Sequence, residues 1–296
     1  MRVFKVPKNL KIYKKVNYPP HNSSFNLQGE ISTRLVKRRK DINTKLTFLP
    51  IQWTNYFIKN KYGENLEEIK KFYETKIKSS DKKFFTVLQY ADGNLFETSS
   101  ITYFAASGLK VGLINPDTKL IKIPLLAEKH HKQVRTLDKK FLASFIGRNT
   151  HPIRENLIKK FEDNSKFYIE VFDEPSISDI RQKKFVELMN SSYFSLAPRG
   201  YGVTSYRLYE SFEFGTVPVY ISNEKEYYLP FEDVVDWKKL CVFFDPDKGG
   251  NLQEQLEEII ASGEYEEMLK YGDYCNRKFF NFDYVTEYII NKVEML

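Results

Sequence analysis

The sequence has little of what cross-links a chain or anchors it in a membrane. It contains two cysteines, Cys241 and Cys275, which are too few for a disulfide framework and stand at no metal-binding spacing. Free thiols in a reducing compartment are therefore expected. Residues 1–8 lack the apolar stretch of a secretory signal, and no run of eighteen apolar residues is present, so no membrane span is expected. Together these absences predict a cytoplasmic protein.

The composition that remains is that of a globular protein with an excess of positive charge. The 296 residues are 42% hydrophobic and 29% charged, and this length allows two domains. The formal net charge is +7, with basic runs at residues 5–15 and 37–40. A solvated surface is the ordinary explanation of such runs, and attraction of an anionic substrate fits equally well. Binding to nucleic acid is a third explanation, but no nucleic-acid-binding motif accompanies the charge.

The second half of the chain alternates between strand-like and helix-like segments. Strands are expected at residues 141–146, 167–172, 193–197, 217–221 and 241–244. Helices are expected between them and after them, at residues 152–164, 178–190, 205–214, 252–260, 264–280 and 283–296. This alternation predicts an α/β protein with a parallel, doubly wound sheet.

The first half of the chain is less regular. Residues 1–45 are polar and basic with weak periodicity, which predicts extended segments and loops. The strands and helices expected after them are strands at 46–50, 83–90, 111–115 and 120–126, and helices at 66–77 and 97–107. The charged residues 127–140 predict a connection between two domains.

The most distinctive stretch runs from residue 193 to residue 221. A short apolar strand is followed by the breaker cluster 198–202 and then by a helix that Thr204 or Ser205 can cap and Gly215 can end. Two glycines, Gly200 and Gly202, let the backbone approach a ligand, and the amides of the helix N-terminus suit an anion. Arg199 adds a positive charge with a planar fork for phosphate oxygens.

Arg207 and Glu210 lie three residues apart and therefore share one face of this helix. A carboxylate beside a phosphate site is costly unless it accepts hydrogen bonds, for instance from ribose hydroxyls, so the combination predicts a nucleotide site. The alternative is that the glycine-rich turn only packs the helix on the strand. Arg207 and Glu210 would then be a surface ion pair of little energetic value.

A second candidate phosphate contact, Gly147 and Arg148, follows the first strand of the second half. Doubly wound folds bind phosphates at such turns, although an exposed loop arginine explains the pattern equally well. Arg154, on the next helix, is expected to be a surface charge.

The central stretch resembles the exostosin family of glycosyltransferases. The residues that carry the resemblance are Pro198-Arg199-Gly200, Tyr201, Gly202, Thr204, Ser205, Arg207, Glu210, Gly215, Val217-Pro218-Val219, Leu229-Pro230-Phe231 and Trp237. A weaker match lies at residues 141–154, so the similarity covers about residues 120–245 well and the N-terminal part loosely. Many members of this family carry an N-terminal anchor, and this chain departs from that, which suggests a cytosolic relative of viral or unicellular origin.

The resemblance implies an inverting enzyme of GT-B fold, with two Rossmann-like domains and a cleft between them. The expected domains are an N-terminal acceptor-side domain, a C-terminal nucleotide-sugar-binding domain and a last helix that packs back on the first domain; their bounds are 1–135, 136–280 and 281–296. The donor expected is a UDP-sugar, with UDP-xylose one candidate among hexoses and pentoses, and the acceptor a glycan or glycoprotein. Arg148, Arg199 and the 200–205 backbone would hold the diphosphate, and Glu210 the ribose.

An inverting transfer needs a general base that deprotonates the acceptor hydroxyl. Asp92 is the first candidate because it lies at the end of an expected central strand, and His21 and His131 follow. The alternatives are that Asp92 belongs to an ordinary Asp-Gly turn and His21 to a solvated loop.

No metal and no cofactor are expected. Asp245-Pro246-Asp247 looks like the metal-binding Asp-x-Asp of other glycosyltransferases, but its place after Trp237 and before Lys248 favours a turn that caps the next helix. In a GT-B enzyme basic residues and helix dipoles stabilise the departing diphosphate. The alternative function is a non-catalytic protein that binds a nucleotide or glycan with the same fold.

Overall fold

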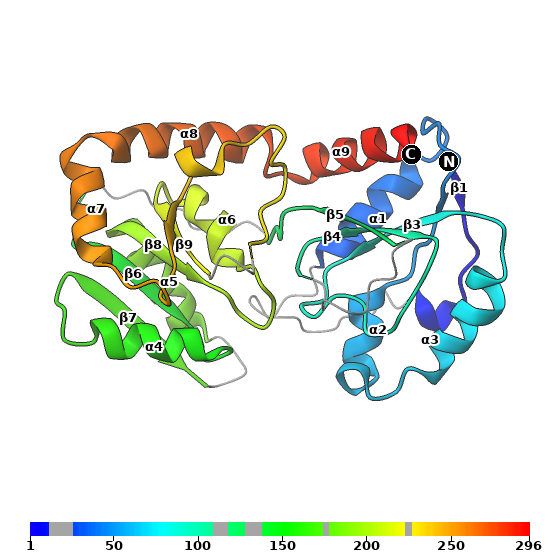
Figure 1. Cartoon of the computed structure of the whole chain (residues 1–296), viewed down its shortest axis with the longest axis horizontal. Coiled ribbons are helices and arrows are strands. Elements are labelled where there is room, and N and C mark those ends of the chain that lie inside the picture. The colour runs from blue at the N-terminus through cyan, green and yellow to red at the C-terminus, as the bar shows by residue number, and fades with distance from the viewer. Residues whose placement is uncertain (12–25, 109–117, 128–137, 174–177, 223–226) are drawn as a thin grey trace. The chain divides into compact units, whose positions relative to one another are not determined.

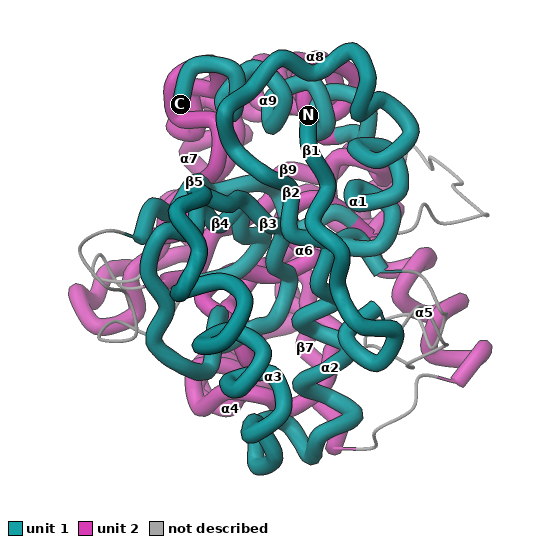
Figure 2. Tube along the Cα trace, turned by 90° about the vertical axis from the view of Figure 1, so that its right-hand side faces the viewer, with its two compact units in different colours: residues 1–18, 23–126, 281–296 teal, residues 19–22, 127–280 magenta. Residues whose placement is uncertain are grey.

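The computed structural model describes most of the chain, namely residues 1–11, 26–108, 118–127, 138–173, 178–222 and 227–296 (Figure 1). The chain divides into two compact units (Figure 2). Unit 1 comprises residues 1–18, 23–126 and 281–296, and unit 2 comprises residues 19–22 and 127–280. The predicted boundary after residue 135 and the strand predicted at 111–115 lie outside the described residues.

Unit 1 contains a parallel five-stranded sheet whose strand order follows the chain. Its strands are β1 (Arg2–Val3), β2 (Thr47–Phe48), β3 (Phe84–Leu88), β4 (Ile101–Ala105) and β5 (Lys119–Lys122). Its helices and helical turns are η1 (Lys8–Leu10), α1 (Leu27–Lys37), α2 (Trp53–Lys59), η2 (Lys61–Gly63), α3 (Glu67–Phe72), η3 (Tyr73–Lys78) and α9 (Phe282–Met295).

Both faces of this sheet are covered. On one face α2, α3 and η3 bury an apolar cluster that includes Trp53, Ile69 and Phe84. The helices α1 and α9 lie side by side (Figure 1, blue and red). Ile289 and Val293 of α9 are fully buried, and Arg34 of α1 forms an ion pair with Asp283 of α9. The last helix of the chain therefore belongs to the unit that contains the first strand.

Two predictions for unit 1 are wrong. The helix expected at 97–107 is replaced by β4, all of whose residues are buried between β3 and β5. Its β-branched and aromatic residues fit a central strand, and this burial outweighs the weak helical pattern. Residues 1–45 do not only form loops, because α1 begins where the side chain of Asn26 accepts a hydrogen bond from the Gly29 amide at 2.8 Å.

Unit 2 contains a second parallel five-stranded sheet, in the order β10-β9-β8-β6-β7. Its strands are β6 (Phe141–Arg148), β7 (Phe167–Phe172), β8 (Ser192–Pro198), β9 (Val217–Ile221) and β10 (Val242–Phe244). Its helices are α4 (Pro152–Phe161), α5 (Asp179–Asn190), α6 (Tyr206–Glu213), η5 (Trp237–Lys239), α7 (Leu252–Ala261) and α8 (Glu264–Lys278). Helices α4, α7 and α8 contribute to the apolar cluster on one face and α5 to a cluster on the other. The predicted α/β class, with two parallel Rossmann-like units, is confirmed.

The order of strands in unit 2 reverses at β6. From β6 the chain first moves to β7 on one side, and then returns to place β8 on the other side of β6. The two loops that leave β6 and β8 at their carboxyl ends therefore depart in opposite directions from neighbouring strands. Such a reversal opens a crevice where doubly wound folds bind ligands.

Candidate functional site

The loops at this reversal contain most of the residues predicted to bind the donor. β6 ends with Gly147 and Arg148, so Arg148 is the last residue of a strand rather than part of a loop. β8 ends at Pro198, and the loop from Arg199 leads directly into α6. Because β6 and β8 are hydrogen-bonded neighbours, the sheet brings Arg148 and Arg199 to the same edge.

Helix α6 begins at this edge with an ordinary cap. The side chain of Ser205 accepts a hydrogen bond from the Arg207 amide at 3.3 Å, so Ser205 is the capping residue and Thr204 is not. Thr204 is buried, and its hydroxyl has no hydrogen-bond partner among the described residues. Gly202 is also buried, whereas Tyr201 is 57% exposed. The loop thus turns one aromatic ring to solvent and keeps its small residues inside.

Arg154 is the site residue that sequence reasoning missed, because the prediction of a surface charge is wrong. Its side chain is 8% exposed and lies under both loops. The guanidinium donates to three backbone carbonyls: Nη1 to Arg148 at 2.7 Å, Nε to Arg199 at 2.9 Å, and Nη2 to Pro198 at 3.3 Å. Burial, and then the charge of Arg207, lower the pKa of Arg154. The third residue of α4 is therefore directed inward, onto the ends of β6 and β8.

Gly200 is required here for space. A Cβ on this residue would lie 3.1 Å from Nη2 of Arg154 and 3.4 Å from the hydroxyl oxygen of Thr150. The backbone of the β8 loop thus rests on the Arg154 side chain, and a larger residue would have to displace one of them. The sequence shows one side of this contact, a glycine directly after an arginine at the end of a strand. The other side, Arg154, lies 46 residues earlier and could not be inferred from the glycine.

Arg207 and Glu210 form an ion pair, which is the alternative to a nucleotide-binding role that the sequence allows. Arg207 Nε lies 3.6 Å from Glu210 Oε2, and both side chains are buried, at 11% and 6% exposure. Arg207 also donates to the carbonyl of Ile146 in β6 at 2.7 Å, and its guanidinium lies 4.3 Å from the centre of the Phe185 ring. The pair is therefore no surface pair: it joins the first turns of α6 to β6 beside the reversal. A role for Glu210 toward ribose stays a prediction.

The candidate base Asp92 lies in unit 1. It stands in the turn that follows β3, the middle strand of that sheet, where the Gly93 amide donates to the Tyr90 carbonyl at 2.9 Å. Asp92 thus has the predicted place beyond the carboxyl end of a central strand, in an Asp-Gly turn. His21 and His131, the other two candidates, lie outside the described residues.

Asp245 and Asp247 form a turn. The side chain of Asp245 accepts a hydrogen bond from the Asp247 amide at 3.0 Å. Helix α7 is capped by Asn251 instead, so the predicted capping role of the aspartates is wrong. Within the described ranges, no three His, Cys, Asp or Glu side chains are grouped so that they could bind a metal ion.

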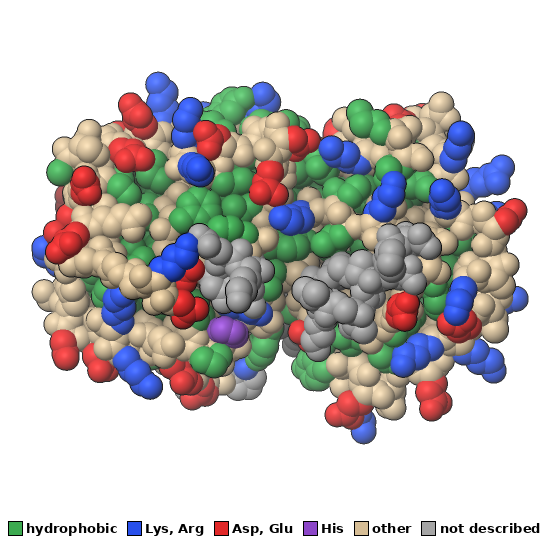
Figure 3. Space-filling model, in the orientation of Figure 1, with side chains coloured by type: hydrophobic (Ala, Val, Ile, Leu, Met, Phe, Trp, Pro, Cys, Tyr) green, Lys and Arg blue, Asp and Glu red, His purple; other side chains and the backbone are tan. Residues whose placement is uncertain are grey.

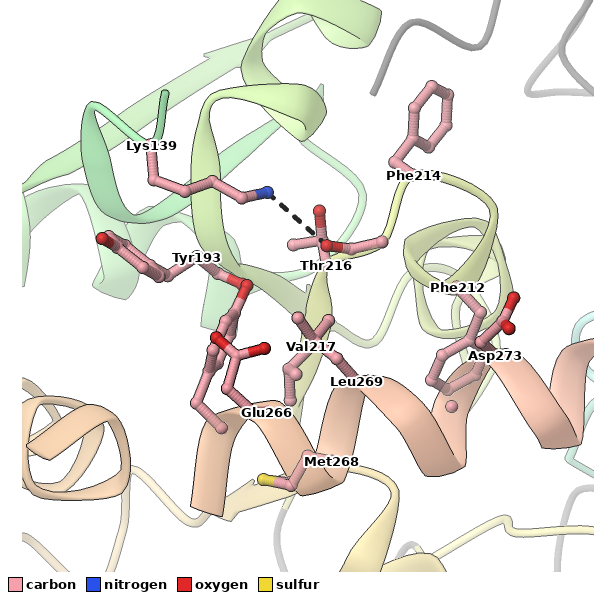
Figure 4. A pocket seen from close by; sticks show the side chains of 13 residues that line it. Lys139, Tyr193, Phe212, Phe214, Thr216, Val217, Glu266, Met268, Leu269 and Asp273 are labelled. Carbon is pink, nitrogen blue, oxygen red and sulfur yellow. Dashed lines mark hydrogen bonds between the residues drawn. The ribbon is translucent and has the colours of Figure 1, made fainter. Parts of the chain in front are cut away.

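Unit 2 also has hollows away from the strand reversal. One, of about 410 Å³, lies beside the first residues of β8 and β9, at the opposite end of the sheet, between Tyr193, Phe212 and Leu269 (Figure 4). Lys139 projects into it and donates to the Gly215 carbonyl at 3.5 Å, and burial lowers the pKa of Lys139 to about 8. None of the predicted donor residues lines this hollow.

Surface charge is mixed on the face that Figure 3 presents, where acidic side chains lie among the basic ones on both units. A nucleic-acid-binding surface is a continuous basic patch or stripe. The basic net charge of the chain is therefore not gathered into such a stripe on this face. In the described part of the chain, no helix has the length and apolarity to cross a membrane.

The fold and these loops define a class of protein: a two-unit α/β protein with basic, glycine-containing loops at the strand reversal of one unit. A family model described as the exostosin GT47 domain matches residues 81–259. The chain belongs to this family, as the resemblance predicted.

Individual relatives match shorter segments. A probable glycosyltransferase of Arabidopsis thaliana is 35% identical over 101 residues, which are 34% of this chain and 20% of that protein. Exostosin-1 of Drosophila melanogaster is 36% identical over 75 residues, or 25% and 9% of the two chains. A probable glucuronosyltransferase of Oryza sativa subsp. japonica is 31% identical over 109 residues, or 37% and 23%. The matched segments thus span less than a quarter of these relatives.

Among solved structures, TarM superposes with a TM-score of 0.45 at 10% sequence identity, over 88% of this chain and 57% of that chain.

Proposed function

We propose that the chain is a glycosyltransferase that moves a sugar from a UDP donor to a hydroxyl group of a glycan or glycoprotein. The observation that carries the proposal is the reversal of strand order between β6 and β8. It brings Arg148, Arg199 and the start of α6 to one edge of the sheet, which is where doubly wound folds bind nucleotides. Membership of the exostosin GT47 family and the names of the relatives support the same function.

In this proposal unit 2 binds the donor. The guanidinium groups of Arg148 and Arg199 and the backbone of residues 200–205 bind the diphosphate, and the N-terminus of α6 adds its partial positive charge. Glu210 accepts the ribose hydroxyls. Its buried pairing with Arg207 is compatible with this role, because a carboxylate has lone pairs for several donors.

Unit 1 supplies the base. Asp92 takes the proton of the acceptor hydroxyl as its oxygen attacks the anomeric carbon, and the bond from that carbon to the diphosphate breaks on the opposite face. The sugar is thereby inverted and UDP leaves with the bonding electron pair. The charge that develops on the diphosphate is stabilised by the arginines and the helix N-terminus, so that no metal is required.

The test is a panel of UDP-sugars, including UDP-glucuronate and UDP-xylose, offered with glycan acceptors in excess EDTA. We expect release of UDP and formation of a product of inverted configuration with at least one donor. An absolute requirement for manganese would contradict the metal-independent mechanism. Binding of UDP by calorimetry without turnover of any donor would favour the non-catalytic nucleotide-binding alternative.

A further inference from the structure

Arg154 has an environment that stability alone does not explain. A buried cation normally has a carboxylate partner, because desolvation of an unpaired charge is costly. In the part of the chain that the structure describes, Arg154 pairs with no carboxylate; its guanidinium contacts the three carbonyls and the ring of Phe145, whose centre is 5.2 Å away. The positive charges of Arg207 and Arg148 lie near it. The edge of the sheet is therefore left with an excess of buried positive charge.

The three carbonyls come from the carboxyl ends of two strands. Arg148 ends β6, whereas Pro198 and Arg199 end β8 and begin the next loop. Through these bonds the Arg154 guanidinium ties the end of β6 to the end of β8. Its planar fork can hold several acceptors in a fixed geometry, which a lysine ammonium cannot do.

These bonds also set the direction of a backbone amide. In a trans peptide unit the C=O and the N–H point in opposite directions. The carbonyl of Arg199 faces the Arg154 Nε at 2.9 Å, so the N–H of Gly200 in the same peptide unit points away from Arg154. The unit after Arg148 follows the same rule: its carbonyl faces Arg154, and the Asn149 amide donates outward to Phe172 of β7 at 2.8 Å. A Cβ on Gly200 would crowd this arrangement, because it would lie 3.1 Å from Arg154 Nη2.

We propose that Arg154 is a positioning residue of the donor site, which orients the Arg199–Gly200 peptide unit and joins the loops after β6 and β8 so that they can bind a diphosphate. The inference rests on the proposed function, since it assigns the diphosphate to these loops. Arg154 acts through the backbone and does not itself contact the ligand. Its positive charge, placed behind the loops, also favours an anion on their other side.

The test compares variants that remove the bonds with a variant that only loosens the same helix. Arg154→Met keeps the length of the apolar stem and removes the donors, and Arg154→Lys keeps the charge but not the fork. Phe161→Leu is the control: it lies on α4, stacks on Phe167 with ring centres 4.1 Å apart, and bonds to neither loop. Affinity for UDP and for inorganic pyrophosphate is measured by calorimetry at a temperature at which circular dichroism shows every variant folded.

We expect Arg154→Met to weaken both ligands roughly tenfold or more, as for the loss of hydrogen bonds to a charged group. Arg154→Lys should recover only a small part of the lost affinity. Phe161→Leu should bind both ligands as the wild type does, even if its melting temperature is lower. Gly200→Ala should also weaken binding. The double variant with Arg154→Met should lose less binding free energy than the sum of the two single losses, because both changes disturb one peptide unit.

A readout without ligand keeps the inference testable in every case. In Arg154→Met the amide of Asn149, which donates to the Phe172 carbonyl at 2.8 Å, should exchange its hydrogen faster than in the wild type, while amides of β10 should not. Unchanged ligand affinity in folded Arg154→Met would overturn the inference and leave the donor site standing. A wild-type protein that binds neither UDP nor pyrophosphate would overturn both this inference and the proposed donor site. Unchanged exchange at Asn149 in the variant would overturn the inference by itself.

Discussion

The two units share a parallel α/β sheet of five strands and differ in how its ends are used. In unit 1 the strands follow one another across the sheet, whereas in unit 2 the order reverses at β6. The buried polar residues differ in the same way. Those of unit 1 are amides and hydroxyls, for example Gln28, Gln52 and Thr86, while the buried charged residues of the described chain, Arg154 and Glu210 with the largely buried Arg207, lie in unit 2.

This difference indicates which unit is better suited to an anionic ligand. A crevice at a reversal with buried charges suits an ionised group such as a diphosphate. The buried amides and hydroxyls of unit 1 add no charge and bond within its own core, as Gln28 does to the Ile51 carbonyl. Under the proposed function the comparison predicts that changes in unit 1 affect the rate of transfer and changes in unit 2 affect the binding of the donor. The predictions below test that division.

The largest effect is expected in unit 1. Asp92→Asn removes the proposed base and should lower the rate of transfer about 10²–10⁴-fold, the usual contribution of general acid–base catalysis. Calorimetric affinity for UDP should not change. The matched control is Asp81→Asn, an exposed aspartate just before the other end of β3. A rate that is the same in both variants would remove Asp92 from the reaction.

A smaller effect, on binding, is expected from the loop of unit 2. Arg199→Ala should weaken UDP binding by roughly 1.5–3 kcal/mol, the range for a charge-assisted hydrogen bond. Arg277→Ala is the control, because Arg277 lies on α8 in the same unit, where its 73% exposed side chain pairs with Asp273. If calorimetry gives folded Arg199→Ala and wild type the same affinity, Arg199 does not contact the donor.

Glu210→Gln tests whether Glu210 serves only its ion pair with Arg207 or also binds ribose. Because Glu210 is buried against Arg207, loss of its charge should lower the free energy of unfolding by roughly 1–3 kcal/mol. If Glu210 also binds ribose, UDP should bind more weakly while pyrophosphate binds as before. Glu213→Gln, one turn further on α6, should change neither. Reduced stability with unaltered affinity for UDP would leave the ion pair as the whole role of Glu210.

The smallest effect is expected where charge lies on the surface of unit 1. Asp283 is 86% exposed in its pair with Arg34. Asp283→Asn should therefore change the free energy of unfolding in urea by less than about 1 kcal/mol. A larger loss would mean that charge rather than apolar packing holds α9 on unit 1, and would weaken the contrast between the units.

What could be predicted from the sequence follows the same division. The elements of unit 2 were predicted within a few residues, because long strands such as β6 alternate with helices that have clear caps and stops. In unit 1 the strands β1 and β2 have two residues each, too few for periodicity to register. Ile101–Ala105 forms a strand because it pairs with β3 on one side and β5 on the other. These pairings cannot be predicted from the local sequence.

The candidate site shows the same limit. Arg199, Gly200 and Glu210 could be singled out because they belong to one continuous motif. Arg154 could not, because its environment is made by carbonyls of two strands that are adjacent only in the folded sheet. An arginine at the third position of a helix has the same local signature whether it faces solvent or a strand end.

The return of α9 to unit 1 has a consequence for the order of events on the ribosome. Residues 23–126 are made before unit 2, yet the helix that buries Ile289 and Val293 in unit 1 follows unit 2 in the chain. The nascent chain must therefore expose the apolar surface that α9 will cover for as long as unit 2 is being translated. Unit 1 can therefore begin to fold before unit 2 is made, but it is completed only after unit 2 has been translated.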